Sequence, residues 1–230
     1  MQIRKKYKLW VRMFMFFTRP VVHKPKFHNI DNLKENAIII TNHNTNIGPA
    51  SWVYHFKYQA MYWGNYRCFE SYKLSKETAY QDFLRLGNPK WIAKLRAIIG
   101  AKLLMKVAKA KNLIFVYDDI RVYKTIKDSI IGYKNGDFVI IYADDPSVSN
   151  TYDIKTIKPG ALMLAKALKE EGIDPNIVLA KLDKKAKNIY LDNPLKLSEY
   201  ENMYSNDNEL LEYFKNRINN LDKKEKENGK

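Results

Sequence analysis

Short, apolar, β-branched runs alternate with longer helical segments in this chain, and this alternation limits its fold more than any other feature. Three such runs are Ala37–Thr41, Leu113–Tyr117 and Phe138–Tyr142. Each is apolar almost throughout, which is typical of strands buried on both faces of a parallel sheet. Strands that alternate with helices predict an α/β domain whose central, largely parallel sheet is flanked by helices.

The rest of the chain adds two strands and several helices to this pattern. Asn176–Leu182 and Ala186–Asp192 are predicted strands. Apolar periodicity predicts helices over Ala50–Tyr62, Lys90–Lys109, Thr125–Tyr133, Pro159–Glu171 and Asn206–Leu221. Residues 63–90 fit neither pattern. Active sites of such folds gather at the carboxyl ends of the strands, so the residues that follow each strand are the first candidates.

The first 19 residues combine an apolar stretch with cationic side chains. Trp10, Phe14 and Phe17 recur at helical spacing, while Arg12 interrupts the stretch. About 20 predominantly apolar residues are needed to cross a bilayer, so this segment is too short to span one. We predict an amphipathic helix over residues 1–19 that lies in a membrane interface, docks on the protein's own core, or does both.

Positive charge is concentrated in the first half of the chain. The 230 residues carry 40 Lys and Arg against 25 Asp and Glu, a formal net charge of +15. Residues 1–60 hold ten of the basic residues and two of the acidic ones. This excess predicts an anionic membrane surface, a phosphorylated substrate or a nucleic acid as partner, unless it is only a generally basic surface. No nucleic-acid recognition motif accompanies the charge, so we expect no nucleic acid partner.

One domain with a short tail accounts for the length of the chain. We expect an α/β domain over residues 20–221 and a disordered polar tail over residues 222–230. The only cysteine, Cys68, excludes an internal disulfide framework and zinc sites built on several thiolates. Such low cysteine usage fits a reducing cytoplasm. The four histidines share no metal-ligand spacing, so no metal is expected.

Polar residues that could carry chemistry follow the predicted strands. Asn42 and His43 come directly after the first strand, where a histidine can serve as a general base or only as a capping group. Asp144 and Asp145 follow the third strand, and such a pair can bind, orient or share a proton, or simply start an Asx turn. Lys158 precedes a predicted helix start, where it could meet a phosphate or be an ordinary surface lysine.

Five segments occur in an order and spacing that are more specific together than any one alone. They are Phe27–Leu33, Ile38–His43, Lys90–Val116, Asn135–Tyr142 and Ile157–Ala165. In this order they resemble the glycerolipid acyltransferase family typified by 1-acylglycerol-3-phosphate acyltransferase. The second segment is similar to the strand and catalytic histidine of the family, and the last to its f-K-x-G-a-x-x-L-A motif.

The resemblance implies a fold, a reaction and a location. It implies transfer of a fatty acyl group from acyl-CoA or acyl-carrier protein to a lysophospholipid-type hydroxyl, in phospholipid biosynthesis and without a cofactor. The enzyme would be peripheral on the inner, cytoplasmic face of the cell membrane. His43 would be the catalytic base. Apart from the resemblance, we hypothesise that Asp144 or Asp145 approaches His43 across the strand ends as a replacement carboxylate, with an oxygen about 2.6–3.2 Å from an imidazole nitrogen. The residues implied to bind substrate are Asn42, Arg121 and Lys158.

The chain departs from the family pattern at charged positions. Gly48 stands where the H-x-x-x-x-D motif has its aspartate, and Ser147 stands where F-P-E-G-T-R has its arginine. Asp118 replaces the arginine of the F-V-x-R motif, with Arg121 three residues later. Loss of the analogous aspartate in a serine-protease triad costs about 10⁴-fold in kcat. The alternative is therefore a catalytically impaired relative that binds lipid or acyl chains at the membrane.

Overall fold

A computed structural model describes Met13 and residues 24–43, 47–66, 71–85, 87–110, 113–117, 119–144, 152–183 and 187–228. The elements in chain order are β1 (Lys26–His28), a 3-10 turn (Ile30–Asn32), β2 (Ile38–Thr41), α2 (Ile47–His55), β3 (Ala60–Asn65), α3 (Tyr72–Arg85), α4 (Lys90–Ala110), β4 (Leu113–Val116), α5 (Val122–Lys134), β5 (Phe138–Tyr142), α6 (Gly160–Glu170), β6 (Asn176–Leu182), β7 (Asn188–Leu191), β8 (Leu195–Lys196), α7 (Leu197–Met203) and α8 (Asp207–Asn228).

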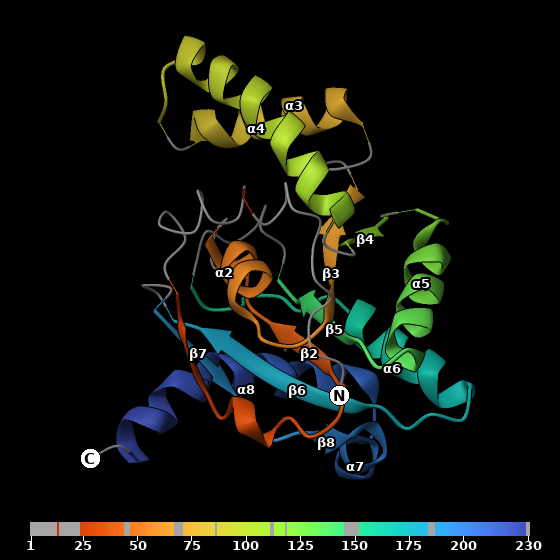
Figure 1. Cartoon of the computed structure of the whole chain (residues 1–230). Coiled ribbons are helices and arrows are strands. Elements are labelled where there is room, and N and C mark those ends of the chain that lie inside the picture. Colours follow the sequence, from red (N-terminus) through yellow and green to blue (C-terminus); the bar gives the residue numbers. More distant parts are fainter. Residues whose placement is uncertain are drawn as a thin grey trace.

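The described strands form one eight-stranded sheet in the order β1-β7-β6-β2-β5-β3-β4, with β8 paired to β6 (Figure 1). Strands β2 to β6 run parallel to one another, whereas β7 and β8 are antiparallel to β6. The carboxyl ends of β2, β3, β4, β5 and β6 therefore meet at the same edge of the sheet, called here the carboxyl edge. Strand β1 is parallel to β7 and so ends at the opposite edge.

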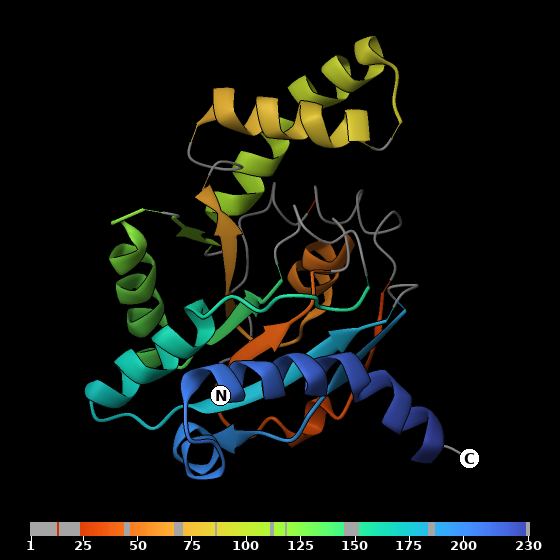
Figure 2. The same ribbon diagram turned by 180° about the vertical axis from the view of Figure 1, so that it is seen from behind.

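Two apolar layers cover the two faces of the sheet, because successive side chains of a strand point to opposite faces. Ile39 and Ile140 face α2, where Trp52 and Phe56 are fully buried. Ile40 and its neighbours on the other face pack against α5, α6, α7 and α8. Figure 2 shows α6 and α8 lying across that second face. Burial on both faces explains why the central strands are continuously apolar.

The α/β fold with a mostly parallel, helix-flanked sheet is confirmed, and β5 and β6 have the predicted bounds. One predicted helix is wrong in its second half. The segment predicted as helical over residues 50–62 leaves the helix after His55, and β3 begins at Ala60. β3 lies between β4 and β5, so its conformation is fixed by pairing with strands that are distant in sequence.

The C-terminal end also differs from the sequence prediction. α8 continues to Asn228, through most of the stretch predicted to be a disordered tail. The first residue of that stretch, Asp222, is buried and pairs with Lys181 of β6, and this contact holds the helix against the sheet there. The predicted helix over residues 1–19 lies outside the described residues apart from Met13. Among the described helices, none is both long and apolar enough to cross a membrane.

Candidate active site

His43 and Asp144 meet at the carboxyl edge of the sheet, after β2 and β5. The two strands pair in register up to Thr41 and Tyr142, and the pairing continues with a hydrogen bond from the Ala143 N–H to the Thr41 carbonyl. The next donor, the His43 main-chain N–H, is bonded to Asp144 Oδ1 at 2.7 Å. The Asp144 carboxylate therefore takes the place of a strand carbonyl and fixes the backbone that carries the histidine.

Burial strengthens this contact. Asp144 is only 4% exposed, and a buried carboxylate attracts a nearby positive charge more strongly than one in water. Its carboxyl group contacts the main chain of the residue whose imidazole would become charged as a base. Asp144 therefore contacts His43 through the main chain of His43. The predicted approach of a carboxylate oxygen to an imidazole nitrogen of His43 stays a prediction. Asp145 lies outside the described residues.

Tyr142 packs against the imidazole and was not among the predicted site residues. The His43 and Tyr142 rings meet edge to face, with centroids 5.4 Å apart and an interplanar angle of 70°. Burial raises the pKa of the Tyr142 hydroxyl well above its ordinary value, so this side chain stays neutral. The sequence held a signal for this contact. Tyr142 is the register partner of Thr41, and side chains alternate along a strand, so Tyr142 is on the face toward which the residue two positions after Thr41, His43, is also directed.

Asn42 ties three segments together beside the histidine. Its amide accepts from the Leu182 N–H at 2.8 Å and donates to the Leu182 carbonyl at 3.1 Å. It also donates to the Tyr152 carbonyl at 3.2 Å. The side chain is 1% exposed, so its polar atoms are directed at protein main chain. In this structure Asn42 joins the end of β2 to the end of β6 and to the segment that follows β5.

Position 48 has no room for a side chain larger than that of glycine. A Cβ built on Gly48 would lie 2.0 Å from the His43 carbonyl oxygen, far inside van der Waals contact. The first turn of α2 therefore packs directly on the main chain of His43, an approach that only glycine permits. An acidic side chain at this position would require α2 to move away from β2.

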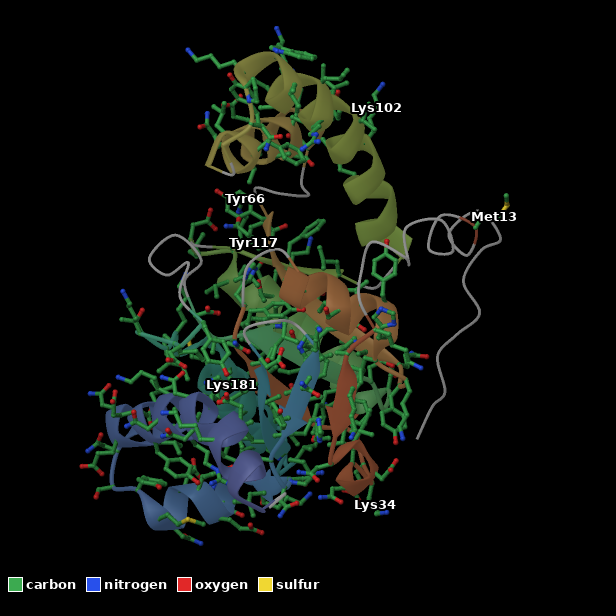
Figure 3. The ribbon with its side chains drawn as sticks, turned by 90° about the vertical axis from the view of Figure 1, so that its left-hand side faces the viewer. Met13, Lys34, Tyr66, Lys102, Tyr117 and Lys181 are labelled. Atoms are coloured by element: carbon green, nitrogen blue, oxygen red, sulfur yellow. The ribbon has the colours of Figure 1, made fainter. Side chains whose placement is uncertain are left out.

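Arg121 lies at the carboxyl ends of β3 and β4, and its charge is already engaged. Its guanidinium binds the Asp119 carboxylate, with 2.8 Å between Nη2 and Oδ2. It also stacks on Tyr117 and Tyr66, with 4.3 and 5.0 Å to the ring centroids. These tyrosines lie side by side between the sheet and the α3–α4 hairpin (Figure 3). Hydrogen bonding to Arg121 lowers the pKa of Asp119 below its ordinary value.

Lys158 is exposed two residues before α6. Its main-chain N–H donates to the Ala143 carbonyl at 2.9 Å, so the segment leading to α6 is fixed one residue from Asp144. Lys158 therefore lies near the ends of β2 and β5, where His43 and Asp144 are, whereas Arg121 lies near the ends of β3 and β4. No cluster of three or more His, Cys, Asp or Glu that could hold a metal occurs within the described ranges.

A buried charged cluster next to Asn42 was also missed by the sequence analysis. Lys181 of β6 is almost fully buried between the sheet and α8 (Figure 3). Its Nζ lies 3.0 Å from Asp222 Oδ1 and 4.0 Å from the centre of the Tyr152 ring. The Tyr152 hydroxyl donates to Asp222, and burial, then this hydrogen bond, raises the Tyr152 pKa. A lone lysine inside the apolar strand Asn176–Leu182 was the available signal.

Comparisons with known proteins add one structural likeness. No family model matches the sequence, and no curated protein matches it. Among solved structures, the fold is similar to the crystal structure of the 1-acyl-sn-glycerophosphate (LPA) acyltransferase, PlsC, from Thermotoga maritima. The two share 13% sequence identity with a TM-score of 0.49, over 90% of this chain and 76% of that chain. A likeness of this extent leaves family and activity to be decided by the site itself.

Proposed function

We propose that this protein is an acyltransferase that moves a fatty acyl group from an acyl-CoA or acyl-carrier-protein thioester to a lysophospholipid-type hydroxyl. The observation that carries the proposal is the placement of His43. It stands at the carboxyl end of a central parallel strand, its main chain fixed by the buried Asp144 and its imidazole packed on Tyr142. The motif resemblance of residues 38–43 and 157–165 supports the same reaction.

The proposed step needs only a base and two substrates. The imidazole of His43 takes the proton of the acceptor hydroxyl while its oxygen attacks the thioester carbonyl carbon. The C–S bond of the tetrahedral intermediate then breaks, and the imidazolium returns the proton to the leaving thiolate. The products are the acylated lipid and a free thiol. No metal or redox cofactor takes part in this balance.

Each neighbour of His43 has a role in this proposal. Asp144 supplies negative charge beside the histidine, which favours the imidazolium that forms in the step. Tyr142 stays neutral and limits the rotation of the imidazole by packing on it. Asn42 is a positioning residue, because its hydrogen bonds hold the end of β2. In this proposal Lys158 and Arg121 bind the phosphate of the acceptor. Asp145 is the alternative to Asp144 as the carboxylate that partners His43.

The substrates set where the enzyme would work. A lysophospholipid resides in a bilayer, so we expect the protein to act peripherally on an anionic membrane surface, at the inner face of the cell membrane. Residues 1–19 are proposed to contribute an amphipathic helix to that contact. Removing residues 1–19 should then weaken binding to anionic vesicles.

Thiol release from acyl-CoA in the presence of lysophosphatidic acid tests the reaction. Wild type should release thiol in proportion to acceptor, and His43→Ala should not. His28→Ala is the matched control, because His28 ends β1 at the opposite edge, where it bonds Asn188 at 3.0 Å and stacks on Tyr190. Acceptor-dependent release that is equal in the two histidine variants would contradict the assignment of His43.

The second candidate is a protein that binds lipid or acyl chains without transferring them. The close approach of Gly48 to the His43 carbonyl favours it, because the aspartate of the family motif is sterically excluded. This candidate predicts saturable binding of acyl-CoA by calorimetry with no acceptor-dependent thiol release from any donor. Turnover that depends on His43 would exclude it.

A further inference from the structure

The helical hairpin between β3 and β4 has two faces with different chemistry. α3 and α4 lie against each other beyond the end of β3, away from the body of the sheet (Figure 1). Ala93, Ala97 and Ala101 of α4 recur every four residues and are buried, so small side chains let the two helices approach closely. This alanine face is the packed side of the hairpin.

The opposite face of α4 is apolar and open to solvent. Trp91, Leu95 and Ile99 also recur every four residues, and they are 71%, 54% and 60% exposed. At 100° per residue, their stripe is centred about 160° around the helix from the alanine face. Three large apolar side chains in one exposed row are unusual for a soluble surface and mark an interaction site.

The charge around this row indicates what it binds. α4 contains six Lys and Arg and no Asp or Glu. Lys94 and Arg96 are exposed about 100° to either side of Leu95, and the exposed Lys102 lies nearly in line with the row, on the same helix in Figure 3. An apolar row with flanking cations matches a bilayer with anionic headgroups, since the rings and aliphatic chains enter the interface while the amines meet phosphates.

We propose that the outer face of α4, residues 90–102, docks in the plane of an anionic lipid bilayer. This surface is separate from residues 1–19, and the proposal does not depend on whether His43 catalyses a reaction. Because β3 ends at the hairpin, docking through α4 would hold the carboxyl edge of the sheet near the membrane (Figure 1).

Vesicle co-sedimentation of the full chain tests this surface. Phosphatidylcholine vesicles with and without phosphatidylglycerol are the probe. Replacing Trp91, Leu95 and Ile99 together by glutamine should weaken binding to the anionic vesicles about tenfold or more. The control makes the same change at Ile120, Ile131 and Met163, which are exposed outside α4, and should bind like wild type.

Charge is tested by a second matched pair. Lys94→Gln with Lys102→Gln should weaken binding at low salt more than Lys124→Gln with Lys127→Gln on α5, although both pairs lower the net charge equally. The proposal is overturned if the pairs behave alike. It is also overturned if wild type ignores anionic vesicles, or if the triple variant keeps vesicle binding while it loses binding to duplex DNA or to an acidic peptide.

Tryptophan fluorescence gives a readout that does not rely on a multiple variant. Brominated lipid quenches a tryptophan that enters the interface. Wild type should be quenched more strongly than Trp91→Phe, which keeps an apolar ring on the helix. Equal quenching in the two proteins would place Trp91 outside the lipid and overturn the proposal.

Discussion

Replacing Lys181 with methionine is expected to lower the free energy of unfolding by about 3–5 kcal/mol, the cost of breaking a buried ion pair from one side. Its Nζ lies 3.0 Å from Asp222 Oδ1, 2.6 Å from the Asn219 carbonyl oxygen and 2.8 Å from Oδ1 of Asp153, whose side chain is 57% exposed. The side chains of Lys181 and Asp222 are 1% and 8% exposed. Methionine fills a similar volume, so the loss arises from a buried carboxylate left without its cation.

A surface pair of the same types is the control. Lys166 of α6 bonds to Asp207 at 2.5 Å, but both side chains are largely exposed. Lys166→Met should therefore cost no more than about 1 kcal/mol. Urea unfolding followed by circular dichroism measures both values, with an unchanged slope confirming that the same surface is exposed. Equal losses in the two variants would refute the reasoning.

A double variant separates charge from packing. Lys181→Met combined with Asp222→Leu removes both buried charges, leaves the solvent-exposed Asp153, and should recover much of the stability lost by Lys181→Met alone. If the double variant is as unstable as the sum of the single variants, the cation and the carboxylate do not act as a pair. The pair also reaches the site, because Tyr152 bonds Asp222 through its hydroxyl and Asn42 through its carbonyl.

Three further predictions concern the residues around the base. Gly48→Ala should lower the free energy of unfolding by about 1–3 kcal/mol, because the new Cβ would meet the His43 carbonyl. Gly100→Ala is the control: the position is in open space within α4, so the change should raise the free energy of unfolding by about 0.5–1 kcal/mol. Thermal melts of both variants measure the difference. Asn42→Ala should cost about 1–3 kcal/mol in urea unfolding, because buried main-chain groups lose their partners, and an unchanged midpoint would contradict that. Tyr142→Phe should leave the free energy of unfolding unchanged or higher, because the buried hydroxyl has no hydrogen-bond partner among the described residues. A large loss of stability in this variant would contradict that reasoning. Tyr142→Ala should reduce acyl transfer, because it removes the ring that packs on the imidazole.

The central strands were predictable because their signal is local. Phe138–Tyr142 is a continuous apolar run and Asn176–Leu182 is apolar except at Asn176 and Lys181, a pattern typical of strands buried on both faces. β3 was missed because residues 56–59, which separate it from the end of α2, include no glycine or proline, and its strand pairing involves residues far along the chain. A strand defined by its neighbours leaves little trace in its own sequence.

The part of the site that lies directly after the strands was predictable from the sequence. Parallel strands finish at one edge, which is why His43 and Asp144 were expected there together; Asp144 reaches the main-chain N–H of His43, and its contact with the imidazole stays a prediction. The contact of Gly48 with the His43 carbonyl could not be foreseen, since it depends on the angle at which α2 leaves the sheet. The pairing of Lys181 with Asp222 likewise depends on how α8 crosses β6.

The rate of acceptor-dependent acyl transfer in wild type relative to His43→Ala tests the central claim most directly. A positioned general base contributes about 10²–10⁴-fold, so the proposal predicts a ratio in that range, with His28→Ala close to wild type. Both variants should retain the wild-type circular dichroism spectrum. A ratio near one, in protein that transfers acyl groups at a measurable rate, would contradict the assignment of His43 as the base.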